Sequence, residues 1–226
     1  MDPGPDAVTG VIFDFHGTLV DTHDPAGWIA DARQVLAERG LPVPAVADDP
    51  GLARHLYEIW THAETFDPAS TRDLSHERHR EVFAQAVALY AGTDAHLTDA
   101  LYAVMARQWV PFTDAVPVLR ALRARGLRVV LLSNIGVDVR PQLARTGLAE
   151  LLDGVVLSYE VGVVKPDPGI FGHALQRLGR PAEQTLMVGD SASADVGGTA
   201  LGIRTLILPR TARPVRGLAA VLRLVG

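Results

Sequence analysis

The chain has no cysteine, which excludes disulfide bonds and thiolate metal sites. It has only one lysine, Lys165, among 21 basic residues, and no basic run that would neutralise the phosphates of a nucleic-acid duplex. No apolar stretch approaches the length of a membrane span, and the first residues lack the features of a signal peptide. With a formal net charge of -5, we therefore expect a soluble, cytoplasmic protein that binds neither nucleic acid nor membranes.

The 226 residues, 48% of them hydrophobic, suffice for one buried core or for a core with an inserted module. Residues 11–13 read Val-Ile-Phe, which is typical of a strand buried on both faces of a parallel sheet. Asp14 ends this run, and a buried carboxylate is costly unless a cation or several donors face it. Gly17 then permits a sharp turn. From this segment alone, Asp14 is as consistent with a turn cap as with a ligand-binding group.

The pattern changes from about residue 20 to residue 108, where strand-like runs give way to helix formers at helical spacing. This predicts an all-helical insert. We assign residues 21–108 to a helical cap domain, and residues 1–20 together with 109–226 to an α/β core domain.

Four helices are predicted in the cap. Within them, His76 and His79 lie one helical turn apart beside charged residues, and we expect a solvated helix face there rather than a metal site. Any of several polar and aromatic cap residues is a candidate for lining a substrate pocket. The predicted helices span residues 25–39, 50–64, 74–90 and 94–109. The candidate residues are His23, Trp28, Trp60, Arg72, His76 and Arg80.

After Pro111, strand and helix patterns alternate, which predicts a doubly wound, Rossmann-like parallel sheet. Asp114 is expected to cap the first helix, which Gly126 ends. The predicted strands are residues 128–132, 154–158, 185–188 and 204–208. The later predicted helices are residues 137–146, 170–178, 194–201 and 217–225.

Four strands end in residues that can bind charge: Asp14, Ser133, Asp190 and, after a short loop, Lys165. The carboxyl ends of parallel strands face one crevice, so we expect these side chains to share one site. Two neighbouring carboxylates repel each other unless a cation lies between them, and oxygen ligands favour Mg²⁺. Lys165 and the Ser133 hydroxyl then hold anionic oxygens, as phosphoryl transfer requires.

These motifs resemble those of the haloacid dehalogenase-like hydrolase superfamily, in its branch of small phosphatases with a helical cap after the first strand. The resemblance covers essentially the whole chain. The opening pattern Asp-x-Asp-x-Thr stands here as residues 14–18, with later motifs at residues 133–134, 165–168 and 189–191 together with Asp195. Each motif alone is weak, but four in order at strand ends are specific.

The resemblance implies a role for each motif residue. Asp14 would be the nucleophile that forms an aspartyl-phosphate. Asp14, the backbone carbonyl of His16 and Asp190 would hold Mg²⁺. Lys165 would neutralise charge in the transition state, and Asp195 would orient Lys165 or a metal-bound water.

The remaining motif residues would bind the phosphate group. They are Thr18, Ser133 and Asn134, the last through its backbone. The function implied is that of an Mg²⁺-dependent phosphomonoester hydrolase acting on a small phosphorylated metabolite.

The departure from the family pattern is His16, where similar phosphatases have the Asp that acts as general acid and base. An imidazole, with an unperturbed pKa of about 6.5, can do this work near neutral pH, and the alternative is a loss of the general acid. Two other functions therefore stay open: a haloacid dehalogenase, against which Asp190 argues, and a non-catalytic protein that binds a phosphate ligand. Phosphonoacetaldehyde cleavage in this superfamily uses a lysine of the cap as a Schiff base. It is disfavoured here because the cap contains no lysine.

Overall fold

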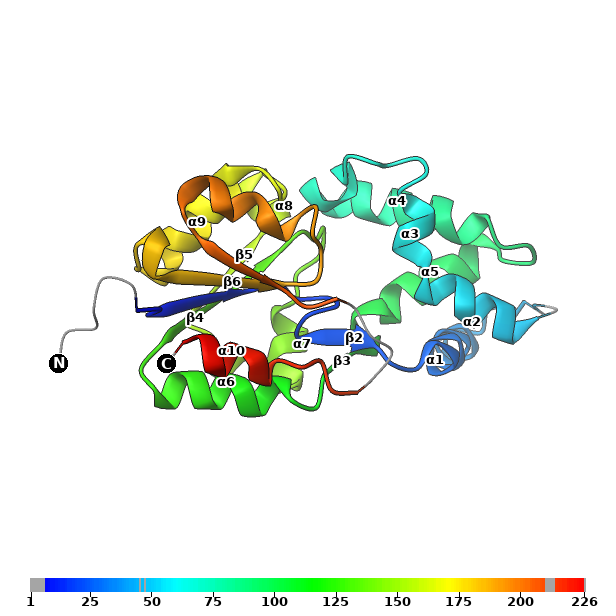
Figure 1. Ribbon diagram of the computed structural model, residues 1–226. Coiled ribbons are helices and arrows are strands. Elements are labelled where there is room, and N and C mark those ends of the chain that lie inside the picture. Colours follow the sequence, from blue (N-terminus) through cyan, green and yellow to red (C-terminus); the bar gives the residue numbers. More distant parts are fainter. Residues whose placement is uncertain (1–6, 45, 47, 210–213, 226) are drawn as a thin grey trace.

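The computed structural model describes residues 7–44, 46, 48–209 and 214–225. A five-stranded parallel sheet forms its centre, in the strand order β5-β4-β1-β6-β7 (Figure 1). The strands are β1 (Gly10–Phe13), β4 (Arg128–Ser133), β5 (Gly154–Leu157), β6 (Thr185–Gly189) and β7 (Arg204–Ile207). Phe13 of β1 is level with Leu131 on one side and Val188 on the other. The order reverses at β1, so ligands are expected at its carboxyl end.

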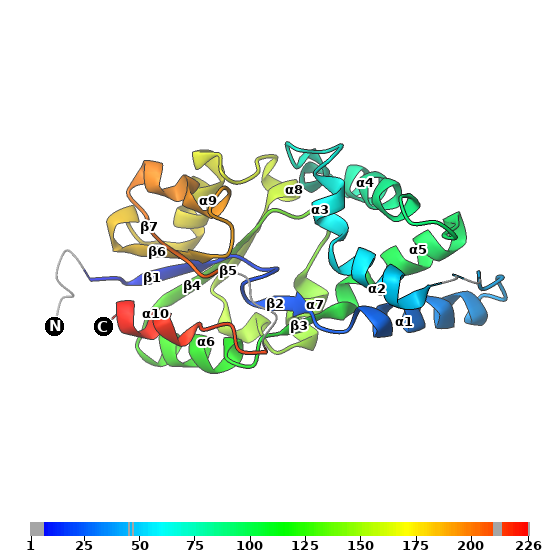
Figure 2. The ribbon, with the colours of Figure 1, turned by 45° about the vertical axis from the view of Figure 1, so that its right-hand side comes forward.

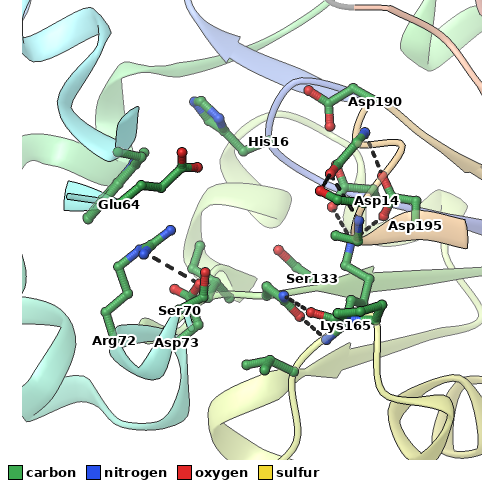
Figure 3. Close-up of a pocket in the computed structure, with 18 of the residues that line it drawn as sticks. Asp14, His16, Glu64, Ser70, Arg72, Asp73, Ser133, Lys165, Asp190 and Asp195 are labelled. Carbon is green, nitrogen blue, oxygen red and sulfur yellow. Dashed lines mark hydrogen bonds and ion pairs between the residues drawn. The ribbon is translucent and has the colours of Figure 1, made fainter. Parts of the chain in front are cut away.

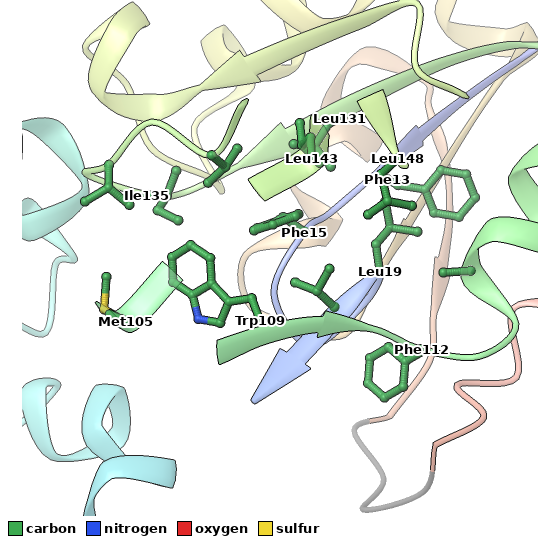
Figure 4. Packing of buried hydrophobic residues seen from close by; sticks show 14 of the residues in the cluster. Phe13, Phe15, Leu19, Met105, Trp109, Phe112, Leu131, Ile135, Leu143 and Leu148 are labelled. Atoms are coloured by element: carbon green, nitrogen blue, oxygen red, sulfur yellow. The ribbon is translucent and has the colours of Figure 1, made fainter. Parts of the chain in front are cut away.

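Helices cover both faces of this sheet, which confirms the predicted α/β class. They are α6 (Ala115–Ala124), α7 (Arg140–Arg145), α8 (Ser158–Val161), α9 (Pro168–Leu178), α10 (Ala219–Leu224) and the 3-10 helix η5 (Asp195–Leu201). Alternate strand residues point to opposite faces. Ile12 and Val130 pack with Phe171 of α9, whereas Phe13 and Leu131 join the larger core on the side of α6 (Figure 4).

The helical segment after β1 lies beside the sheet, near the carboxyl ends of its strands (Figure 2). Side chains of Asp24, Asp48, Ser75 and Asp94 each accept a hydrogen bond from the first turn of the helix that follows, which fixes four of the helix starts. The helices are α1 (Pro25–Glu38), α2 (Asp49–Tyr57), α3 (Ile59–Ala63), α4 (His76–Ala88) and α5 (Ala95–Val104), with 3-10 turns η1 (Thr71–Leu74) and η2 (Met105–Gln108).

A two-stranded antiparallel ribbon connects the sheet domain to the helices, and the sequence analysis missed it. β2 (Val20–Thr22) pairs with β3 (Trp109–Pro111), so strand structure does not stop at residue 20, and the helix predicted to reach residue 109 ends earlier. Two runs of three residues are too short to show a strand period. The two strands can pair only because the segments that enter and leave the cap lie side by side in the folded chain.

Other predicted helices differ in length or type. Residues 50–64 form two helices that meet at Glu58. Of residues 74–90, Leu74 ends the 3-10 turn η1 and the α-helix spans only His76–Ala88. Residues 137–146 are helical only in α7. Residues 195–201 form a 3-10 helix rather than the predicted α-helix. Gly197 gives a physical reason, because a Cβ there would collide with the carbonyl oxygen of Pro166 and glycine weakens α-helices.

Asp114 does not cap α6 with its side chain, contrary to the prediction. Its carboxylate accepts hydrogen bonds from the backbone N–H groups of Arg216, Gly217 and Leu218 instead. The side chain therefore ties the segment before α10 to the start of α6. Within the ranges that the structure describes, every helix is too short or too polar to cross a bilayer.

We expect Phe171→Ala to lower the free energy of unfolding by about 3–5 kcal/mol, because Phe171 is fully buried between α9 and the sheet. Leu201→Ala, at a position that is 39% exposed, should change it by less than about 0.5 kcal/mol. Urea unfolding followed by circular dichroism measures both. Equal losses for the two variants would contradict the packing described for this face.

Candidate active site

A cavity of about 790 Å³ lies between the carboxyl ends of β1, β4 and β6 and the helical cap (Figure 3). All predicted site residues except Thr18 line it, so the expected convergence at the strand ends is what the structure has. These residues are Asp14, His16, Ser133, Asn134, Lys165, Asp190 and Asp195.

Lys165 joins two of the carboxylates at the floor of the cavity. Its Nζ donates to Asp14 Oδ1 at 2.7 Å and to Asp195 Oδ1 at 2.6 Å (Figure 3). Burial raises the pKa of Asp14 to about 7; Asp195 and Asp190 add to this effect, and Lys165 opposes it. Burial alone would lower the pKa of Lys165, but Asp14 and Asp195 raise it above its ordinary value. The ammonium group therefore stays charged between the two carboxyl groups.

Asn134 holds the loop that carries the lysine. Its side-chain Nδ2 donates to the Lys165 carbonyl at 3.0 Å, and the Lys165 N–H donates to Asn134 Oδ1 at 2.7 Å. Because both polar atoms of the amide are used in this way, the Asn134 side chain positions Lys165. This leaves the backbone of Asn134 and the hydroxyl of Ser133 for the predicted phosphate contacts.

The carboxylates beside Lys165 fit a hard divalent cation. One oxygen each of Asp14, Asp190 and Asp195 lie within 4.8 Å of one another. Asp14 Oδ2 is buried and accepts no hydrogen bond from any described residue, an expensive state for a carboxylate oxygen without a cation. Asp195 already accepts from Lys165 and from the Ser191 N–H. Asp14 and Asp190 would therefore be the better direct ligands for Mg²⁺, with the His16 carbonyl as a predicted third.

Two glycines let these acidic groups approach. Gly17 has a φ of +85°, and a Cβ there would collide with the Asp190 carboxylate. A Cβ at Gly189 would collide with the carboxylate of Asp195. Larger residues at either position would therefore push an acidic group out of place.

His16 extends into the cavity near the cap (Figure 3). Asp21 Oδ1 is 3.6 Å from His16 Nε2, and the imidazole meets the Trp109 ring edge-on at 5.9 Å. Asp21 is buried on β2, and Trp109 begins β3. The sequence analysis missed both neighbours because it did not predict this ribbon.

Thr18 differs from the other predicted site residues. In the described chain its side chain is fully buried and does not line the cavity. The Thr18 hydroxyl has no hydrogen-bond partner among the described residues. The structure therefore does not bring it to the other phosphate-binding candidates, and that role stays a prediction.

The cap supplies the wall opposite the strand ends. Of the six cap candidates, Trp60 and Arg72 line the cavity, whereas His23, Trp28, His76 and Arg80 are not among its lining residues. The sequence analysis missed other lining residues because no spacing distinguishes them from solvated polar residues. These are Glu64, Ser70, Asp73 and His79.

The expectation that His79 belongs to a solvated helix face is wrong. His79 is only 2% exposed, its Nδ1 lies 3.0 Å from the Tyr102 hydroxyl, and its ring packs against Trp60 at 4.7 Å. Gly136 of the core permits this packing, because a Cβ there would collide with His79. Burial lowers the pKa of His79 to about 3, with Arg72 and His76 adding to the effect.

We expect His79 to make the protein less stable in mild acid. An unfolded histidine titrates near a pKa of about 6.5, so below that pH the unfolded chain binds a proton that folded His79 does not. The free energy of unfolding should therefore fall by up to about 1.4 kcal/mol per pH unit from pH 6.5 downwards. His79→Gln should flatten the slope measured by urea unfolding between pH 7 and 5. Tyr102→Phe, which keeps the imidazole, should retain it, and a slope that His79→Gln leaves unchanged would refute this assignment.

Comparisons with known proteins point to one family. A family model described as haloacid dehalogenase-like hydrolase matches residues 8–200. A ribulose-1,5-bisphosphate 5-phosphatase of Halopiger xanaduensis is 32% identical over 206 residues, which cover 88% of this chain and 84% of that protein. A pyrimidine 5'-nucleotidase of Escherichia coli is 37% identical over 111 residues. That match spans about half of each protein, 48% of this chain and 49% of the relative.

Solved structures share the fold. A crystal structure of a dehalogenase aligns with 97% of this chain and 97% of its own, with a TM-score of 0.71 and 23% sequence identity. At this identity the likeness establishes the arrangement of the core and the cap.

Proposed function

Because the chain belongs to the family of haloacid dehalogenase-like hydrolases, we propose that it is an Mg²⁺-dependent hydrolase of phosphomonoesters. The proposed substrate is a small phosphorylated metabolite, and the reaction proceeds through an aspartyl-phosphate on Asp14. The names of the matched phosphatase and nucleotidase, which describe small phosphorylated substrates, support this substrate class. A cytoplasmic location and the lack of nucleic-acid or membrane partners stay predictions from the sequence.

The observation that carries the proposal is the Asp14 carboxylate held by Lys165 in the same cavity as Ser133. One oxygen of Asp14 is fixed at 2.7 Å from the ammonium group, which orients the carboxylate at the end of β1. A phosphate group bound there meets the charge of Lys165 and the hydroxyl of Ser133. These groups offset the charge that gathers on the phosphoryl oxygens in the transition state.

In the proposed reaction, an Asp14 oxygen attacks the phosphorus atom while the bond to the ester oxygen breaks. His16 gives its proton to the departing alkoxide, and as the neutral imidazole it then takes a proton from the water that attacks the aspartyl-phosphate. Inorganic phosphate leaves and the Asp14 carboxylate is restored. Asp14 and Asp190 would hold Mg²⁺, which would supply positive charge to offset that of the phosphoryl oxygens. Asp21, 3.6 Å from His16 Nε2, supports the orientation of the imidazole.

We expect the purified protein to release phosphate from a panel of small phosphomonoesters in the presence of Mg²⁺. Asp14→Asn should reduce kcat by at least about a thousandfold because it removes the nucleophile. Asp99→Asn, which removes an exposed cap carboxylate that pairs with Arg80, should retain activity. Release is followed by a colorimetric phosphate assay.

Two results would replace this proposal with one of the alternatives. Halide release from 2-chloropropionate in EDTA, without phosphate release from any ester, would assign the site to dehalogenation. Binding of phosphate esters without release of either product would assign it to a non-catalytic ligand-binding protein.

We expect His16→Gln to affect alkyl phosphates more than nitrophenyl phosphate. An alkoxide needs a proton to leave, whereas nitrophenolate leaves without one, so kcat for alkyl esters should fall by about a hundredfold and kcat for the aryl ester far less. Steady-state rates on both ester types measure the difference. Equal losses on the two would show that His16 holds the substrate or the loop and transfers no proton to the leaving group.

A further inference from the structure

The cap wall of the cavity carries a pair of charged residues that the proposed chemistry does not use. Arg72 is 8% exposed and Asp73 is 6% exposed, yet both line the cavity opposite the strand ends (Figure 3). Glu64, from the end of α3, extends into the same space. Polar side chains buried to this degree are costly unless they are paired or meet a ligand.

The hydrogen bonds that anchor the Arg72 side chain all go to Asp67. Its Nη1 donates to Asp67 Oδ2 at 3.1 Å, and its guanidinium group lies 5.5 Å from the centre of the Trp60 ring. The Asp67 carboxylate is itself fixed by hydrogen bonds from the Thr71 N–H and hydroxyl. Among the described residues, Nη2 of Arg72 has no hydrogen-bond partner. A rigid guanidinium group therefore keeps donors available for a ligand.

Asp73 supplies acceptors beside these donors. Its Oδ2 is 3.8 Å from Arg72 Nε, and no described residue donates a hydrogen bond to its carboxylate. Burial raises the pKa of Asp73 to about 6, with Arg72 opposing the effect, so the carboxylate predominates above neutral pH. Both oxygens can therefore accept hydrogen bonds from a ligand in the cavity.

The core holds this pair at a fixed place relative to the phosphate site. The Ser158 hydroxyl donates to the Asp73 carbonyl at 2.6 Å and accepts from the Ile135 N–H at 2.8 Å. Ile135 follows Ser133 by two residues. A Cβ at Gly136 would collide with the carbonyl oxygen of Arg72, so the cap segment rests directly on this loop. A ligand that reaches both sites is thereby selected for its length.

The balance of charge indicates what kind of group fits. Two carboxylates, those of Asp67 and Asp73, lie 3.1 and 3.8 Å from the Arg72 guanidinium group. Glu64 adds a third carboxylate to the same cavity, so a second anion on the substrate is repelled. An ammonium group is disfavoured as well, because it would face the unused N–H donors of Arg72. Hydroxyl groups both donate and accept, and they suit a wall where acceptors and donors alternate beside an aromatic ring.

We propose that Arg72, Asp73 and Glu64 form a subsite for an uncharged, hydroxyl-rich leaving group, so that the substrates are phosphate monoesters of sugars or polyols. This inference rests on the proposed function. It adds the chemical class of the alcohol that is released when the phosphate ester is hydrolysed. The subsite lies in the cap, apart from the residues that act on phosphorus.

Glycerol 3-phosphate and 3-phosphoglycerate test the proposal, because the second carries a carboxylate in place of a hydroxymethyl group. We expect the wild-type protein to favour glycerol 3-phosphate in kcat/KM by at least about tenfold, and to favour it over phosphoethanolamine as well. Asp73→Asn should reduce the preference for glycerol 3-phosphate over 3-phosphoglycerate by about tenfold. Glu64→Gln should shift this preference in the same direction, and Glu64 is at an exposed position that tolerates substitution. Asp99→Asn removes the same charge outside the cavity and should leave the ratio unchanged.

Binding to Asp14→Asn by titration calorimetry separates this inference from the proposed function. If no ester is hydrolysed, the phosphatase proposal fails, and the ratio of the two dissociation constants still tests the subsite. An equal or stronger preference for 3-phosphoglycerate or phosphoethanolamine would overturn the inference. A ratio that neither Asp73→Asn nor Glu64→Gln changes would do the same.

Discussion

The structure depends on one buried electrostatic contact, the ammonium group of Lys165 between the carboxylates of Asp14 and Asp195. Burying a lone charge would cost several kcal/mol, and each of these groups is tolerable only because the others are in place. The three come from the end of β1, the loop before α9 and the start of η5. Only a parallel sheet whose strand order reverses at β1 brings these distant segments to one point.

Much of the remaining architecture can be understood as support for this contact. Asn134 holds the backbone of Lys165 from both sides, and Gly17 and Gly189 leave room for the acidic groups around it. The charges do not balance completely, because Asp190 adds a further carboxylate and one oxygen of Asp14 is buried without a hydrogen-bond donor among the described residues. That deficit of positive charge suits a divalent cation.

The site residues at the strand ends could be predicted from the sequence, whereas those contributed by the cap and the ribbon could not, and the reason is physical. Asp14, Asp190 and Lys165 follow apolar strands or a short loop, and the geometry of parallel sheets alone brings such positions together. Asp21 and Asp73 have no comparable signal, because a three-residue ribbon and a 3-10 turn leave no periodic pattern. The burial of His79 likewise depends on Gly136, which lies far away in the sequence. The contacts between the cap and the core depend on the tertiary structure, which local sequence patterns do not encode.

The core and the cap thus divide the work. In the proposed function the strand ends of the core act on phosphorus. The cap, which rests on the loop after Ser133, presents a separate polar wall to the remainder of the ligand. The central claim is that Asp14 attacks phosphorus, and mass spectrometry of an acid-quenched single turnover tests it most directly. The account predicts a phosphoryl group on Asp14. A phosphoryl group on His16, or turnover that leaves every peptide unmodified, would contradict it.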